Sequence, residues 1–206
     1  GSQYESFDQE ELWSYEAGFK SSFMENRLIV NAAVYYMDIE NMQVDEAISY
    51  LETYTTNAAE ASGYGFELDV KARLFKGFSV TAGFGYNHIE FDKFQDALGD
   101  YQGNMPSYAP EYTLNIGAQY RHVSGFFARA DLIGYGKMYL DHANRYARDA
   151  YQVVNAKIGY ETKHFDVYLY GKNIFDEEYD LVGYSGGYGV IYSEPGEFGL
   201  QLTCRF

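Results

Sequence analysis

Few side chains in this sequence have the types and spacing that catalysis or metal binding requires. The histidines are scattered and the only cysteine stands alone, so neither a zinc site nor a disulfide is predicted; these residues are His88, His122, His142, His164 and Cys204. No nucleophile, base and acid occur in a recognisable catalytic arrangement. The sequence therefore predicts no enzyme activity, no resident metal and no cofactor.

The most regular chemistry lies in charged side chains that alternate with apolar ones. Between residues 66 and 74, five apolar residues alternate with four charged ones. Because successive side chains of a strand point to opposite faces, one face here is apolar and the other is charged. With two charges from the first expected strand, the candidates on the polar face are Glu16, Lys20, Glu67, Asp69, Lys71 and Arg73. They either pair with a partner inside a cavity or simply hydrate this face.

A second candidate group lies near the C-terminus and combines acidic with aromatic side chains. Asp176, Glu177, Glu178 and Asp180 precede the segment YSGGYGVIYSEPGE. Acidic loops rich in tyrosine suit a cationic or metal-bearing ligand, and a solvated loop rim is the ordinary alternative. The ligand-loop candidates are Tyr179, Asp180, Tyr184, Tyr188 and Tyr192.

Strands must position these residues, because alternation with period two recurs along almost the whole chain. The closing stretch is typical: Phe198, Leu200 and Leu202 share one face, and Gln201 and Thr203 lie on the other. Composition agrees, with 23 Tyr, 15 Phe and 21 Gly but only 3 Pro. We expect an all-β antiparallel fold of about nine strands, at residues 11–23, 28–44, 61–75, 78–91, 110–121, 126–139, 150–161, 165–175 and 196–206.

The connections between the expected strands alternate between short and long. Short turns lie at 24–27, 76–77, 122–125 and 162–164, and long connections follow Val44, Phe91, Tyr139 and Phe175. Aromatic residues stand at the strand ends beside the short turns, namely Phe23, Phe75, Phe78, Tyr120, Phe126, Tyr160, Phe165 and Phe206. Tight turns at one end and an aromatic girdle are typical of transmembrane barrels, so we expect the apolar face to contact lipid.

Charge and hydropathy exclude other classes. A net charge of −15 argues against a nucleic-acid partner, whose phosphates require clusters of Lys and Arg. An odd number of strands leaves sheet edges open, so we expect a fragment of a larger barrel rather than a closed pore. Residues 1–10, which begin Gly-Ser, are expected to be the remnant of an expression tag and a leading loop, and residues 11–206 the barrel segment.

Four stretches of the sequence share a family likeness: YQVVNAKIGYETKHFDVYLYGKNIFDEEYD (151–180), GEFGLQLTCRF (196–206), NAAEASGYGFELDVKARL (57–74) and PEYTLNIGAQY (110–120). The first resembles the penultimate hairpin of TonB-dependent outer-membrane receptors, and the second resembles their closing strand. The other two are similar to further strands of that family. The resemblance covers nearly the whole chain.

The resemblance implies the C-terminal part of a plugged transmembrane barrel of about 22 strands in the outer membrane of a Gram-negative bacterium. Such receptors take up a scarce ligand, for example an iron–siderophore complex, with the help of a plug domain and TonB. By the same resemblance, the charged polar-face residues would meet the plug. The terminal Phe206 would be the signal read by the barrel assembly machinery.

Two other classes fit the alternating pattern. One is a soluble antiparallel β-sandwich that binds a protein or a sugar, and the other is a small outer-membrane barrel unrelated to TonB, with or without enzyme activity. A second layer of the chain packed on the apolar rows would identify the sandwich.

Overall fold

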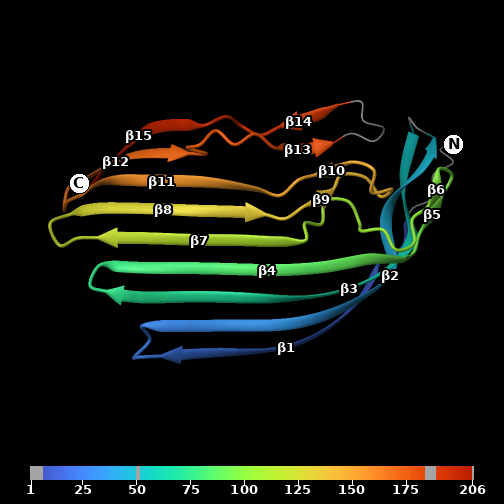
Figure 1. The fold of residues 1–206 in the computed structure, drawn as a ribbon, viewed down its shortest axis with the longest axis horizontal. Coiled ribbons are helices and arrows are strands. Elements are labelled where there is room, and N and C mark those ends of the chain that lie inside the picture. Colours follow the sequence, from blue (N-terminus) through green and yellow to red (C-terminus); the bar gives the residue numbers. More distant parts are fainter. Residues whose placement is uncertain (1–6, 50–51, 184–188, 206) are drawn as a thin grey trace.

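A single large antiparallel sheet dominates the computed structural model, which describes residues 7–49, 52–183 and 189–205. Its nine strands follow one another in the order β1-β2-β3-β4-β7-β8-β11-β12-β15 (Figure 1). In the described part of the chain, no helix has the length and hydropathy to cross a membrane. The predicted all-β antiparallel fold is confirmed.

The strands of this sheet are β1 (Glu11–Phe23), β2 (Leu28–Ser49), β3 (Glu52–Phe75), β4 (Phe78–Lys93), β7 (Tyr112–Arg121), β8 (Phe126–Tyr135), β11 (Tyr151–Glu161), β12 (Phe165–Lys172) and β15 (Glu197–Cys204). Two-stranded sheets are formed by β5 (Gln95–Asp96) with β6 (Gly99–Asp100), β9 (Met138–Tyr139) with β10 (Ala147–Arg148), and β13 (Asp180–Gly183) with β14 (Val190–Tyr192). Most bounds of the nine strands lie within a few residues of the predicted ones.

Strand register divides the sheet into two faces. Across β2, β3 and β4 the partners Val34, Phe66 and Tyr86 lie side by side, and Ala33, Glu67 and Gly85 lie beside them on the opposite face. We call the face with Phe66 the outer face and the face with Glu67 the inner face. Because a register shift of one residue would exchange the faces, this pairing keeps apolar rows together across the sheet.

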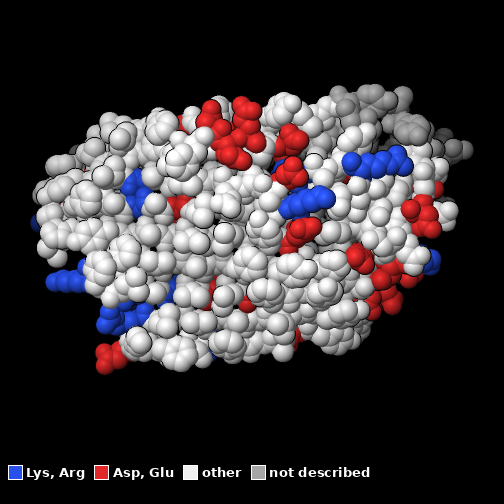
Figure 2. All heavy atoms as spheres, viewed as in Figure 1, with Lys and Arg blue, Asp and Glu red and all other residues white. Residues whose placement is uncertain are grey.

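Large apolar side chains on the outer face are exposed. The exposed fractions are 72% for Leu200, 68% for Phe198 and 62% for Trp13. Figure 2 shows broad uncharged areas over the strands. Acidic side chains gather beside the strands nearest the C-terminus and toward the end of the sheet that bears the long connections, which we call the loop end. No second sheet covers these rows within the described ranges, so the soluble sandwich is the wrong alternative for this chain.

The four predicted short turns all lie at one end of the sheet. In the β1–β2 turn, Met24, Glu25 and Asn26 have φ values of 51°, 56° and 63°. Gly77, between β3 and β4, has a φ of 83°, and a Cβ placed on it would lie 2.2 Å from the carbonyl oxygen of Arg121. Glycine is required at this turn because the neighbouring turn approaches its backbone so closely.

The β2–β3 hairpin is longer than predicted. β2 was expected to end at Val44 and β3 to begin at residue 61, but pairing continues through bulges around Met42 to Ser49 and Glu52. Asn41 takes a φ of 53° at the first bulge, and the Thr55 hydroxyl donates to Asp45 at 2.8 Å farther out. In this extension Asp45 and Thr55 are exposed whereas Ala59 is buried, and apolar residues do not alternate regularly with polar ones.

The connection after β4 folds into a compact layer with the connection after β8. Its apolar core consists of Ile39, Val44, Ala59, Ala61, Ile89, Phe91, Phe94 and Tyr101. The Asn144 side chain bridges to the backbone of Met105 in both directions, with Met105 N donating at 2.9 Å and Asn144 Nδ2 donating at 2.8 Å. We call residues 94–109 and 139–146 the loop cap. The sequence predicts two long connections here but not their shared core.

Candidate functional site

Four of the predicted polar-face residues line one hollow on the inner face. Glu16 and Lys20 from β1 face Glu67 and Asp69 from β3 across Asn31 of β2, around a space of about 440 Å³. Gly18 and Ala33, which are paired in register, form its floor because neither has a long side chain. Three carboxylates and one ammonium group therefore surround a water-accessible depression.

The other two predicted residues, Lys71 and Arg73, lie on the same face of β3 but outside this hollow. All six charged side chains are exposed. No ion pair joins any of the six to another residue of the described ranges. Their charges are therefore open to water or to a partner.

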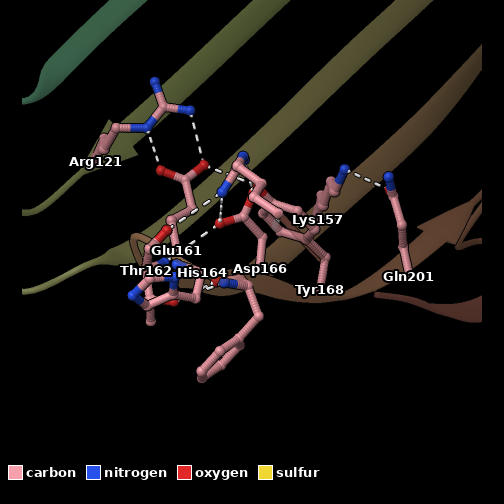
Figure 3. A network of polar contacts seen from close by, with 10 residues as sticks. Arg121, Lys157, Glu161, Thr162, His164, Asp166, Tyr168 and Gln201 are labelled. Atoms are coloured by element: carbon pink, nitrogen blue, oxygen red, sulfur yellow. Dashed lines mark hydrogen bonds and ion pairs between the residues drawn. The ribbon is translucent and has the colours of Figure 1, made fainter. Parts of the chain in front are cut away.

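Charges on the other half of the inner face are paired within the sheet, an arrangement that the alternating pattern did not predict. Arg121 at the end of β7 donates two hydrogen bonds to Glu161 at the end of β11, at 2.6 Å and 2.9 Å (Figure 3). The Tyr168 hydroxyl on β12 donates to the same carboxylate at 2.8 Å. The polar-face positions of Arg121 and Glu161, each just before a short turn, were the available signal.

Lys157 and Asp166 make further contacts in this network. Lys157 donates to Gln201 at 2.8 Å and lies 3.9 Å from the centre of the Tyr168 ring (Figure 3). Asp166 accepts hydrogen bonds from both terminal nitrogens of Arg205. The inner face thus has a self-paired wall on β7–β15 and an unpaired wall on β1–β3.

A tyrosine cluster lies at the loop end of the inner face. Tyr135 at the end of β8 and Tyr151 at the start of β11 are register partners, with ring centres 5.3 Å apart. Tyr179 stacks on Tyr151 at 3.8 Å with an angle of 15°. The Arg148 guanidinium lies 4.7 Å from the Tyr151 ring. We call Tyr135, Tyr151 and Tyr179 the tyrosine cluster.

The ligand-loop candidates reach this cluster only in part. Tyr179 belongs to it, and the Asp180 carbonyl accepts a hydrogen bond from Arg148 at 3.2 Å. Tyr192, paired with Asp180, is 67% exposed. Tyr184, Tyr188 and the assembly-signal residue Phe206 lie outside the described residues.

The acidic segment before the cluster is held by hydrogen bonds between side chains and backbone. Asn173, 7% exposed, donates to the carbonyl of Glu177 at 2.9 Å and accepts from the Glu177 amide at 2.9 Å. The Asp176 carboxylate accepts from the Gly196 amide at 2.7 Å. The segment therefore forms a defined corner between β12 and β15, with the side chains of Glu177 and Glu178 exposed.

The histidines occupy separate environments. His88 lies 3.0 Å from Glu90 and His122 lies 2.8 Å from Ser124, whereas His142 packs edge-on against Phe94 in the loop cap. Among the residues that the structure describes, no three His, Cys, Asp or Glu side chains form a metal-binding group.

The sequence of this chain is similar to those of known outer-membrane receptors. Residues 2–174 match the family model described as TonB dependent receptor-like, beta-barrel. The chain is 28% identical over 184 residues to the ferrioxamine receptor of Yersinia enterocolitica, covering 84% of this chain and 25% of that protein. It is 26% identical to the ferrichrome outer membrane transporter/phage receptor of Escherichia coli K12, covering 93% of this chain and 26% of that protein. The chain thus spans about a quarter of these relatives' length.

Solved structures share the fold. The ferric yersiniabactin uptake receptor FyuA of Yersinia pestis superposes with a TM-score of 0.80 at 22% identity, over 95% of this chain and 30% of that one. The siderophore receptor PiuA of Acinetobacter baumannii superposes with a TM-score of 0.78 at 23% identity, over 95% of this chain and 28% of that one.

Proposed function

This chain belongs to the TonB-dependent receptor β-barrel family, and from this we propose that it forms the C-terminal wall of an outer-membrane receptor that imports an iron–siderophore complex. The receptor is a transporter of a Gram-negative bacterium and performs no catalysis. Relatives that match along most of the chain include a ferrioxamine receptor and a ferrichrome transporter, which supports an iron chelate as the ligand. The observation that carries the proposal is the family match combined with one sheet that is apolar outside and charged inside.

The outer face is suited to lipid in its dimensions as well as its composition. A row of aromatic partners, Tyr15, Tyr36 and Tyr64, crosses β1, β2 and β3 toward the loop end. On β3, residues 65–74 separate Tyr64 from Phe75 beside the short turn. This span agrees with the roughly 9–11 residues that a tilted transmembrane strand needs. Two aromatic rows at this separation fit the two interfaces of a bilayer.

On the inner face, the unpaired wall is the proposed contact with the plug domain. Glu16, Lys20, Glu67 and Asp69 surround a hollow that accepts side chains of a partner, with Lys71 and Arg73 beside it. Charges in a water-filled cavity are inexpensive, so they need no partner for the sheet to be stable. Their lack of ion pairs within the sheet supports a role in binding another domain.

The loop end is the proposed ligand side. Tyr179, Asp180, Tyr184, Tyr188 and Tyr192 are the candidate contacts for the chelate. TonB acts through the plug after the ligand binds, and Phe206 directs the chain to the barrel assembly machinery.

Iron uptake by cells grown under iron limitation tests the proposed function. Cells that express the full-length receptor should take up radiolabelled iron from a supplied ferric siderophore, and deleting the receptor gene or inactivating TonB should abolish this uptake. A receptor embedded in the outer membrane whose uptake continues unchanged without TonB would contradict the proposal. The charge reversal Glu67→Lys, on the unpaired wall, should lower uptake while leaving the amount of assembled receptor unchanged.

A further inference from the structure

Arg148, beside the tyrosine cluster, is a buried cation that has no carboxylate partner. Only 8% of its surface is exposed. Its terminal nitrogens donate to the Asp180 carbonyl at 3.2 Å and to the sulfur of Met138 at 3.1 Å, and its Nε has no hydrogen-bond partner. Within the described residues, the positive charge is therefore compensated by rings and neutral groups alone.

This arrangement is costly for the fold. Burying an unpaired cation costs more free energy than a cation–π contact with an aromatic ring returns. The chain has 30 Asp and Glu residues against 15 Lys and Arg, so acidic partners are abundant in the sequence. A buried polar atom without a partner is rare in folded proteins and calls for an explanation, such as a bound ligand nearby.

The same position gives the cluster its electrostatic character. The guanidinium lies 4.7 Å from the Tyr151 ring and 6.0 Å from the Tyr135 ring, so its field reaches the surface of both. Tyr135 and Tyr179 are half-buried and present part of their rings at the surface. A strongly negative protein thus holds a local positive potential behind aromatic surfaces.

We propose that the tyrosine cluster is a subsite for an anionic iron chelate with aryl groups, and that Arg148 sets this preference for negative charge. The inference rests on the proposed function and specifies its ligand class. Aryl groups of the chelate stack on the tyrosine rings, and Arg148 stabilises the chelate's negative charge from beneath them. A neutral chelate gains only the stacking, and a cationic chelate is repelled.

Binding to the purified full-length receptor tests the preference, with two probes measured by titration calorimetry. One probe is a ferric tris(catecholate), which is anionic and aryl-bearing, and the other is a ferric trihydroxamate, which is nearly neutral. The variant Arg148→Gln should weaken catecholate binding about tenfold or more and change hydroxamate binding little. Arg148→Lys should retain most of the catecholate affinity because it keeps the charge.

Arg145→Gln is the matched control, because Arg145 is exposed in the same connection and the variant removes the same charge. It should leave both affinities unchanged. Where Arg148→Gln does not assemble, Tyr179→Leu takes its place, and it should weaken the catecholate alone.

The possible outcomes distinguish failure of the charge preference from failure of the receptor function. If the wild-type receptor prefers the hydroxamate, or if Arg148→Gln or Tyr179→Leu weakens both probes equally, the charge preference is wrong and the receptor function stands. If neither probe binds and neither supports iron uptake, the proposed function fails together with the subsite.

Discussion

The guanidinium of Arg205 lies against the carboxylate of Asp166 and donates a hydrogen bond to each of its two oxygens. Arg205 follows β15, and Asp166 lies at the start of β12. The Asp166 side chain is only 6% exposed, and Arg205 also donates to the carbonyl of Thr162 at 3.3 Å. The last strand of the sheet is therefore fixed to its neighbour at the end where the chain terminates.

We expect Asp166→Asn to loosen β15. The asparagine removes the charge and one acceptor from a bidentate pair, so hydrogen exchange at the amides of residues 199–204 should become faster. Lys172→Gln is the control, because its pair with Glu197 at the other end of these strands is exposed on both sides, and it should have a smaller effect. Equal exchange rates in the two variants would show that the Asp166–Arg205 pair stabilises β15 no more than the exposed Lys172–Glu197 pair does.

The assignment of faces predicts opposite outcomes for adjacent residues of β3. Val70, between Val30 and Ala82 on the outer face, lies midway between the aromatic rows. Val70→Lys should destabilise the receptor in lipid vesicles by about 2–4 kcal/mol, measured by denaturant unfolding. Asp69→Lys, on the inner face, should cost far less. A reversed order would mean that the inner face contacts lipid.

The loop cap should weaken in acid because of His142. Burial lowers the pKa of His142 below its ordinary value of 6.5, against the opposing influence of Asp45, Asp141 and Asp96. The open cap therefore binds a proton more readily than the closed cap, and the stability present above pH 6.5 is lost as the pH falls below it. Hydrogen exchange at residues 91–104 should accelerate over this range.

His142→Gln should remove most of this pH dependence. His88→Gln is the control, since His88 lies on the outer face of β4, beside Glu90 and with its ring centre 5.1 Å from that of Tyr64. The prediction fails if exchange in the cap is equally pH-dependent with and without His142.

The β3–β4 turn should not tolerate a side chain. Gly77→Ala has a positive φ and a Cβ 2.2 Å from a carbonyl oxygen, so it should cost about 2 kcal/mol or more and reduce the amount of assembled receptor. Gly103→Ala is matched to it, because φ is 79° and nothing lies within 4 Å of the added Cβ. It should cost only the backbone strain, about 1 kcal/mol. Similar losses of stability in both variants would show that the backbone at Gly77 moves to make room for the added Cβ.

Period-two alternation predicted the nine strands and their faces because it reflects a local property, the direction of successive side chains. It failed for the outer part of the β2–β3 hairpin, where Thr55 hydrogen-bonds to Asp45 across the hairpin and apolar residues do not alternate regularly with polar ones. It also could not predict the loop cap. Phe91 of β4 and His142 of the connection after β8 meet there although they are far apart in the sequence, and no local pattern encodes such a contact.

The candidate site was predictable to a similar extent. Alternation placed Glu67 and Asp69 correctly on the polar face, but their gathering around one hollow with Glu16 depends on the register of three strands. Arg121 and Glu161 were overlooked because they are 40 residues apart and belong to strands that are not adjacent. Arg148 carried no sequence signal, since burial without a counter-ion is visible only in three dimensions.

The division of the inner face into two walls gives it an uneven response to the salt of its surroundings. At 0.1 M salt, dissolved ions reduce the electric field of an exposed, unpaired charge over a distance of about 10 Å. They weaken close, partly buried ion pairs much less. Brine therefore weakens the electrostatic attraction between β1–β3 and a neighbouring domain relative to fresh water. The ion pairs within β7–β15 are nearly as strong in one as in the other.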